Sequence, residues 1–183
     1  YCFQEIQNHK WEGAAMLEKC DVKSLDQNVF SLIGEQWMLI TAGTAEHCNT
    51  MTASWGGLWV LWGSDVATCY IGPQRYTYEF VEGSDYFTLS FFGPEYRKAL
   101  ALCGAQSGRE VDKVKECGFT VRTGEGGAPY FAEAELVLVC RKVYWQDIEP
   151  AHFLDPEIDE RWYPEKDYHR MYIGKIVETY RKK

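Results

Sequence analysis

The residues of this chain best suited to chemistry form the segment Asn49-Thr50-Met51-Thr52-Ala53-Ser54-Trp55-Gly56, between two predicted strands. Its hydroxyls and amide can hydrogen-bond the polar edge of a ring, and irregular backbone before the glycine can offer free N–H groups to an anion. The tryptophan can cover the face or edge of a flat ligand. Strand ends rich in Ser and Thr also arise from turn formation alone, so that interpretation stays open. As a binding site, the segment favours a ligand with a flat apolar face and an anionic tail.

A second group of polar residues, Pro73-Gln74-Arg75-Tyr76-Thr77-Tyr78-Glu79, begins a predicted helix. The guanidinium of Arg75, the hydroxyl of Thr77 and the free N–H groups of a first helical turn are suited to hold a phosphate. An ion pair between Arg75 and Glu79, one turn on, explains the same spacing equally well. Lys98 and Arg109 are weaker candidates of the same kind, because a charge on a predicted helix is usually solvated.

Several common catalytic and metal-binding patterns are missing from the sequence. It has no Cys-x-x-Cys pair, no His-Glu-x-x-His, no Gly-x-Ser-x-Gly, no P-loop and no Gly-x-Gly-x-x-Gly fingerprint. The adjacent His47 and Cys48 are weak metal-ligand candidates and are more typical of an exposed turn. We therefore predict no metal site, no hydrolase triad and no nucleotide site of the Rossmann or Walker type.

Apolar patterns predict the elements that position these residues. The run 37–42 is typical of a strand buried on both faces, and the polar residues 44–48 turn it back into a hairpin with the opening segment. Residues 86–92 alternate, so one face would enter the core and the other, with Ser90 and Phe92, would line a cleft. Further strands are predicted at 65–71, 135–145 and 171–180, and helices at 74–82 and 94–103.

Three more helices are predicted from their ends. Asp26 can cap a helix that ends near Gly34, and Ser107-Gly108-Arg109-Glu110 has the form of a capping box for a helix that stops at Gly118. A short helix is also expected around Ala14 to Lys19. Strands separated by short helices favour a mainly β fold, an antiparallel barrel with peripheral helices, over a doubly wound sheet. We expect an N-terminal arm (1–25), a single domain (26–183) and, within it, an ordered acidic excursion (146–166).

Charge and cysteine content limit the partners and the compartment. The chain has 183 residues and a net charge of −8, with a pI of about 5.1, which opposes binding to nucleic acid or to an anionic membrane. Any anionic ligand must therefore be held by local donors. Seven cysteines in no tight spacing, with no signal-peptide pattern, favour a reducing, cytoplasmic setting. No apolar run approaches 18 residues, so no transmembrane helix is expected.

Taken together, these segments resemble the flavin reductase-like family, and within it the flavoredoxin type. Asn49 to Ser54 looks like the family's flavin-contacting segment, and Arg75 and Thr77 fall where the family places phosphate contacts. Ser90-Phe91-Phe92 falls on its strand beside the flavin ring. The similarity runs from about residue 26 to residue 177. It implies an FMN-binding split β-barrel, usually a homodimer with each flavin near the subunit interface.

The same resemblance extends to Asp167-Tyr168-His169-Arg170-Met171-Tyr172, which looks like the closing strand region of flavoredoxin-type members. It implies that His169 faces the cofactor, whereas a lone histidine before a strand is more often structural. The chain departs from the family pattern in having Trp55, Trp59 and Trp62 within eight residues. We expect these tryptophans to narrow the cleft over the flavin and so to restrict what can approach it.

The resemblance implies a flavoprotein oxidoreductase that passes reducing equivalents from a reduced nicotinamide, NADH or NADPH, through FMN to an acceptor. In that case the cofactor performs the chemistry, and no side chain is assigned as acid, base or nucleophile. The alternative is a flavoredoxin-like electron carrier that is reduced by a partner protein and does not react directly with nicotinamide. A split-barrel protein that holds haem or no cofactor is a third possibility.

Overall fold

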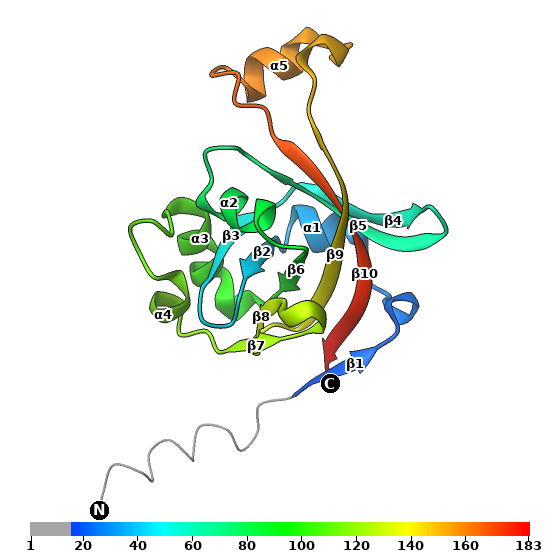
Figure 1. Ribbon diagram of the computed structural model, residues 1–183, viewed down its shortest axis with the longest axis vertical. Helices are drawn as coiled ribbons and strands as arrows, with labels where there is room; N and C mark the ends of the chain where they lie inside the picture. Colours follow the sequence, from blue (N-terminus) through cyan, green and yellow to red (C-terminus); the bar gives the residue numbers. More distant parts are fainter. Residues whose placement is uncertain (1–15) are drawn as a thin grey trace, which may run out of the picture.

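An eight-stranded antiparallel sheet forms the body of the protein, in a computed structural model that describes residues 16–183 (Figure 1). The strands follow the order β3-β2-β6-β9-β10-β5-β4, and β1 pairs with the far end of β10. This path does not close on itself, as expected for a split barrel, so the predicted fold class is confirmed. The strands of this sheet are β1 Leu17–Cys20, β2 Met38–Gly43, β3 Cys48–Ala53, β4 Gly56–Leu61, β5 Ser64–Ile71, β6 Tyr86–Phe91, β9 Leu136–Asp147 and β10 Arg170–Lys182.

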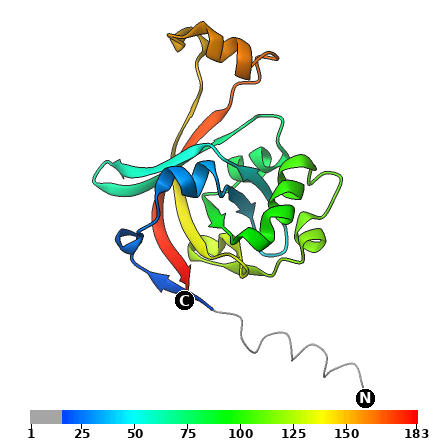
Figure 2. The ribbon, with the colours of Figure 1, turned by 180° about the vertical axis from the view of Figure 1, so that it is seen from behind.

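Short helices and one small hairpin surround the sheet. In Figures 1 and 2, α2, α3 and α4 gather on the side of the barrel where β3 lies, and α5 projects away from the barrel. The hairpin consists of β7 Val121–Thr123 and β8 Pro129–Phe131. The α-helices are α1 Val29–Gly34, α2 Tyr76–Glu82, α3 Arg97–Ala105, α4 Lys113–Cys117 and α5 Pro156–Trp162, and the 3-10 turns are η1 Val22–Ser24, η2 Pro94–Tyr96, η3 Glu125–Gly127 and η4 Pro150–His152. Among the described residues, no helix is both long enough and apolar enough to cross a membrane.

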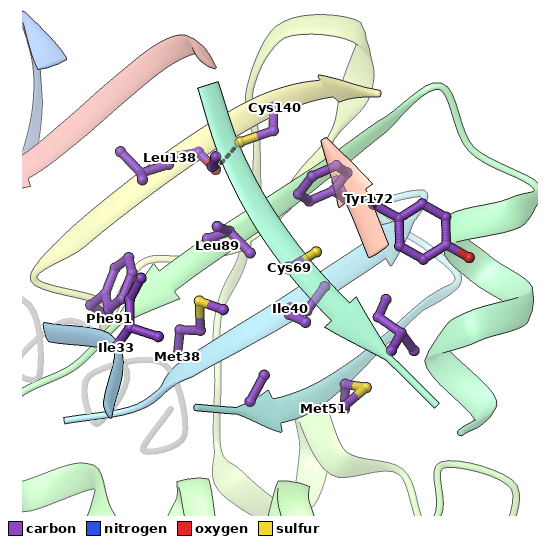
Figure 3. Packing of buried hydrophobic residues seen from close by; sticks show 14 of the residues in the cluster. Ile33, Met38, Ile40, Met51, Cys69, Leu89, Phe91, Leu138, Cys140 and Tyr172 are labelled. Atoms are coloured by element: carbon purple, nitrogen blue, oxygen red, sulfur yellow. Dashed lines mark hydrogen bonds between the residues drawn. The ribbon is translucent and has the colours of Figure 1, made fainter. Parts of the chain in front are cut away.

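Two hydrophobic clusters lie on opposite faces of the central strands. Alternation along β6 sends Phe87, Leu89 and Phe91 into the first cluster, inside the barrel (Figure 3). Phe92, just beyond the strand, belongs to the second cluster, which also includes side chains of α3 and of β8. The predicted core face of this strand is therefore confirmed. The prediction that its other face lines a cleft is wrong, because the helices and the small hairpin bury that face too.

The N-terminal helix predicted around residues 14–19 is wrong where the structure describes it. Leu17 to Cys20 form β1, which pairs with the end of β10 from Leu17 opposite Lys182 to Cys20 opposite Thr179. The edge of β10 offers unpaired backbone groups there, which a four-residue segment satisfies better as a strand than as a single helical turn. Residues 14 and 15 of that prediction lie outside the described residues. Since β1 joins the sheet, we propose that residues 17–25 belong to the domain rather than to a separate arm.

Two predicted helix caps are also wrong. Asn28, not Asp26, caps α1, since its Oδ1 accepts hydrogen bonds from the N–H groups of Phe30 at 3.0 Å and Ser31 at 3.3 Å. Ser107 closes a turn by accepting from the N–H of Arg109, and no helix starts there. The next helix, α4, begins six residues later behind an Asp112 cap and ends, as predicted, at Gly118, whose φ of 66° suits glycine.

The excursion between β9 and β10 carries a helix of its own. It contains η4 and α5, whose first turn is capped by the Asp155 carboxylate. Its base is tied by a hydrogen bond from the N–H of Ile148 to the carbonyl of His169. The excursion therefore brings aromatic side chains of α5 and its flanks to the end of the barrel where the segment after β3 also arrives.

Candidate functional site

β3 carries the opening segment and lies at one end of the strand order, paired with β2. The carbonyl of Thr50 accepts a hydrogen bond from Lys113, so it points away from β2. Backbone groups alternate in direction along a strand, and the N–H and C=O of Thr52 therefore also face the unpaired edge. Met51 and Ala53 send their side chains into the first core cluster, and by the same alternation their backbone groups face β2, so neither residue offers a free group at this edge.

Asn49 connects β3 to the elements beside it. Its Nδ2 donates a 2.8 Å hydrogen bond to the hydroxyl of Thr77 on α2, and both side chains are buried. Gly108 packs against the Asn49 amide so closely that a Cβ at this position would overlap the amide oxygen. The structure thus brings two predicted site residues, Asn49 and Thr77, into direct contact and covers them with the segment that leads to α4.

Arg75 precedes α2 and is half-buried. Its Nη2 donates to the carbonyl of Gly104 at the end of α3 at 2.9 Å, and burial lowers its pKa. The ion pair with Glu79, the alternative interpretation of this arginine, does not form, because Glu79 pairs with Arg109 instead. Arg75 is therefore held in place by a neutral oxygen, and its charge is not cancelled.

Lys113 is a second cation at the same place, and it is only 5% exposed. Its Nζ donates to two carbonyls, those of Thr50 and Cys103, each at 2.8 Å. Burial lowers the pKa of Lys113 to about 8, and the nearby charge of Arg75 adds to the lowering. Of the ion pairs that join residues 16–183, none involves Lys113 or Arg75. A buried lysine and a half-buried arginine that repel each other and lack a carboxylate form a site that an anion would stabilise.

The other end of the site is aromatic. The ring of Trp55 lies 4.8 Å from that of His169 and 5.3 Å, edge on, from that of Trp162. Beside these rings is a cavity of about 430 Å³, within the range of small-molecule sites. It is lined by Trp55, Tyr70, Ile148, Phe153, Ile158, Trp162 and Tyr163. Such walls suit a flat apolar ligand.

His169 links the aromatic end to the cations. Burial lowers its pKa, with a further lowering by the charge of Arg75 and an opposing effect of Asp167, so the imidazole is neutral at pH 7. Its Nδ1 is buried and has no hydrogen-bond partner in the described part of the chain. The charge of Arg75 lowers the pKa of both Lys113 and His169, so the cationic end and the imidazole are close enough to interact electrostatically.

Other predicted site residues are not brought to this place. Ser90 is fully buried in an interior strand between Leu39 of β2 and Val137 of β9. Phe91 lies in the first core cluster, and Phe92 in the second. Two further predicted residues are exposed: Lys98 on α3 and Ser54 just after β3. Neither side chain forms a hydrogen bond or an ion pair within the described residues. Ser54 adjoins Trp55, whereas Lys98 does not.

Two expectations about individual side chains also change. The hydroxyl of Thr52 donates to the carbonyl of Leu100 on α3, so it fastens a helix to the sheet edge. Trp59 and Trp62 do not narrow the site, because they lie on the β4–β5 hairpin, where Trp59 donates to Thr68 and Trp62 packs against Tyr144. Of the three neighbouring tryptophans, Trp55 is the one at the candidate site.

Sequence reasoning missed Lys113 and the aromatic side chains of the excursion. A lysine that opens a helix is normally solvated, and nothing local distinguishes Lys113 from Lys115. The one available signal was its position between the apolar residues Val111 and Val114, which place that turn of the chain against the protein. Tyr163 and Trp162 lie in a segment whose acidic composition concealed their role.

Comparisons with known proteins agree with this architecture. A flavin reductase-like, FMN-binding domain protein from Shewanella baltica superposes with a TM-score of 0.66 at 16% identity, covering 92% of this chain and 78% of the other. A flavoredoxin from Methanosarcina acetivorans gives 0.64 at 24% identity, with 90% and 77% covered. An NADH:FAD oxidoreductase from Streptomyces globisporus gives 0.61 at 17% identity, with 80% and 75% covered.

At these identities the superpositions show a common fold. No curated protein matches the chain. The model of the flavin reductase like domain, however, matches residues 30–183, which is most of the sequence and includes every residue of the site described above. The resemblance inferred from the motifs is thereby confirmed, and the chain belongs to the flavin reductase-like domain family.

Proposed function

We propose that this protein binds FMN and uses it to pass reducing equivalents from a reduced nicotinamide to an acceptor. The observation that carries the proposal is the pair of uncompensated cations, Arg75 and Lys113, in a chain of net charge −8. A buried charge is unfavourable unless it is paired, so the site favours an anionic ligand group. The phosphate of FMN supplies that group, and the aromatic end beside Trp55 suits the flavin ring.

The residues present fit the cofactor in three respects. Arg75 and Lys113 can neutralise a phosphate dianion, and the Asn49–Thr77 pair holds the adjoining backbone in place. The free edge of β3 at Thr52 offers backbone N–H groups to the polar edge of a ring. FMN, when bound, would supply the hydride and electron chemistry, and the protein binds and orients it and excludes water.

The aromatic end defines the surroundings of the ring. His169 and Trp162 each pack against Trp55, and an apolar cavity lies beside them. A neutral His169 with an unpartnered Nδ1 can donate or accept one hydrogen bond there without adding charge. Direct reaction with NADH or NADPH requires that this cavity admit the nicotinamide.

A flavoredoxin-like carrier, reduced by a partner protein, is the second candidate. The edge contact between Trp55 and Trp162 favours it, since the contact narrows the approach to the aromatic end. The flavoredoxin from Methanosarcina acetivorans and the oxidoreductase from Streptomyces globisporus, both with this fold, correspond by name to the two candidates. Anaerobic addition of NADH or NADPH separates them: rapid bleaching of the flavin supports the reductase, and bleaching only with a redox partner supports the carrier.

Arg75→Ala tests the site itself. If Arg75 holds the phosphate, the affinity for FMN falls by more than the affinity for riboflavin, which has the same ring and no phosphate. Equal losses of both affinities, or purified protein that fails to take up FMN at all, would refute the proposal. Lys98→Ala serves as the control, because Lys98 is exposed on α3 and is not among the residues that line the cavity at the aromatic end.

We also propose a homodimer in a reducing, cytoplasmic setting. Large apolar side chains are exposed on the β4–β5 hairpin, on β9 and just before α5, among them Trp62, Trp145 and Leu154. The six cysteines of the described residues are all free. Light scattering on the purified protein measures the mass in solution, and a monomer at micromolar concentration would refute the dimer.

A further inference from the structure

The thiols of Cys103 and Cys117 face each other between α3 and α4, two helices that lie side by side (Figure 1). Their sulfur atoms are 3.7 Å apart, and the sulfur of Cys117 also lies 3.8 Å from the carbonyl oxygen of Ala99 on α3. A disulfide needs a sulfur–sulfur distance of about 2.05 Å. Two sulfurs already in contact can reach it by rotation of their side chains, without the backbone movement that distant cysteines require.

The two thiols differ in access and in acidity. Cys103 is fully buried, and burial raises its pKa to about 12. Cys117 is half-buried, and burial raises its pKa too, but a hydrogen bond from Cys103 and the charge of Lys113 lower it again. Cys117 is therefore the thiol that meets an oxidant first, and Cys103 lies directly behind it. Redox-active cysteine pairs have this arrangement, an accessible thiol beside a second thiol that can bond to it.

The same two helices hold the cation pair. The carbonyl of Cys103 accepts the hydrogen bond of Lys113 at 2.8 Å, and the next carbonyl, that of Gly104, accepts from Arg75 at 2.9 Å. Lys113 begins α4 and Cys117 ends it, so the two side chains lie one turn apart on the same face of the helix. A bond between the two sulfurs would therefore attach the far end of α4 to the segment of α3 that already holds its first residue.

In the reduced protein α4 depends on docking for its place. It has five residues, too few for a helix that is stable alone. Lys113 is 5% exposed and burial lowers its pKa to about 8, so undocking of α4, which returns this charge to water, is favoured until an anion binds. Local opening of α4 is thus the route by which a phosphate held at Lys113 would leave.

We propose that Cys103 and Cys117 are a site of reversible oxidation, and that the disulfide between them fixes α4 to α3 and slows release of the flavin. The effect on the flavin rests on the proposed function, whereas the disulfide and its effect on α4 do not.

The oxidant is a peroxide. The Cys117 thiolate attacks one oxygen of hydrogen peroxide, the O–O bond breaks, and hydroxide leaves with the proton of Cys117 as water. The sulfur of Cys103 then attacks the resulting sulfenic acid, the S–O bond breaks, and the oxygen leaves with the proton of Cys103 as a second water. The two sulfurs lose two electrons to the peroxide, and a dithiol reductant restores both thiols by exchange.

The experiment compares reduced and peroxide-treated wild-type protein with two variants. Cys117→Ser lacks the pair, and Cys20→Ser, at a half-buried cysteine of β1, is the matched control. Free thiols are blocked with N-ethylmaleimide, and mass spectrometry of unreduced peptides detects linked cysteines. Amide hydrogen exchange of residues 113–117 in flavin-free protein measures the opening of α4, and the fluorescence of free FMN after dilution of the complex measures release. Thermal unfolding checks that each variant is folded.

We expect peroxide to link Cys103 to Cys117 in the wild type and in Cys20→Ser, and dithiothreitol to reverse the link. Oxidation should slow both the exchange of α4 and the release of FMN at least about tenfold, because a cross-link between cysteines 14 residues apart typically opposes opening by more than this factor. Cys117→Ser should show neither effect.

Oxidation of Cys117 without a linked peptide, or a disulfide that leaves either rate unchanged, overturns the inference. A disulfide that slows the exchange of α4 in a protein that takes up no FMN supports the thiol site and overturns the proposed function instead.

Discussion

Replacing Lys113 with methionine should separate the binding of an anion from the stability of the fold. Lys113→Met keeps the length of the side chain, so the packing of α4 against β3 is largely retained, but it removes the charge and both hydrogen bonds. The matched control is Lys115→Met, two residues along the same helix, whose side chain is exposed.

The effect on stability follows from two opposing terms. The pKa of Lys113 falls from an ordinary 10.5 to about 8, which corresponds to a cost of about 3.4 kcal/mol for holding the charged form in the folded protein. Methionine removes this cost but leaves the carbonyls of Thr50 and Cys103 without their donor, at about 1 to 3 kcal/mol each. The two terms largely offset each other, so the unfolding free energy of the flavin-free protein should change by less than about 3 kcal/mol.

Flavin binding should change much more. A charged donor to a phosphate contributes about 1.5 to 3 kcal/mol, so the FMN dissociation constant of Lys113→Met should rise about 10- to 150-fold. The riboflavin dissociation constants of the variant and of the wild-type protein should agree within about twofold, since riboflavin has no phosphate for Lys113 to contact. Fluorescence titration measures both constants, and urea unfolding measures the stability. An unchanged FMN constant, or equal losses for FMN and riboflavin, would refute the placement of the phosphate at Lys113.

Four further results are expected from the same structure. A bound phosphate favours the charged form of Lys113, so FMN affinity should fall as pH rises above about 8 while riboflavin affinity does not, and a flat FMN profile contradicts this. In the flavin-free protein, folded Lys113 loses its proton above about pH 8, whereas the unfolded chain keeps this proton up to about pH 10.5. The unfolding free energy of the wild type should therefore rise relative to that of Lys113→Met between pH 8 and 10.5, as urea unfolding can measure. Trp55→Ala should weaken FMN and riboflavin alike, by about three- to tenfold, and a loss confined to FMN would place the ring elsewhere. Burial raises the pKa of Cys103 to about 12, so iodoacetamide at neutral pH should label it far more slowly than the half-buried Cys20; equal labelling by peptide mass spectrometry would contradict its burial.

The strands were predictable wherever their pattern was local and long. The apolar run of β2 and the alternation of β6 each specify a strand from adjacent residues alone. β1 was not predictable, because Leu-Glu-Lys-Cys fits one turn of helix as well as four residues of strand. What decides its conformation is the edge of β10, more than 150 residues further along the chain, and such pairing leaves no local mark.

The site was predictable in the same partial way. Asn49, Thr77 and Arg75 were selected because their side-chain types suit a phosphate and a polar ring, and the structure brings them together. Lys113 was not predicted as a site residue because its burial depends on tertiary packing. Its two carbonyl partners come from β3 and α3, 63 and 10 residues away. The prediction that Phe92 lines a cleft was wrong for the converse reason. Alternation shows that a strand has two faces, but it does not show what covers the second face.

The type of partner, more than the number of cations, is what makes Arg75 and Lys113 suited to the anion proposed here. Arg109 lies in the same neighbourhood as Arg75 and Lys113, but its partner is the carboxylate of Glu79, which satisfies its hydrogen bonds and cancels its charge together. Arg75 and Lys113 are held by carbonyl oxygens, which orient a donor and leave its full charge available to a ligand. In a protein of net charge −8 the long-range field repels an anion, so only such short-range, unneutralised charges can hold one. Added salt should therefore weaken FMN binding less than it weakens the exposed ion pairs, because buried charges are the least screened.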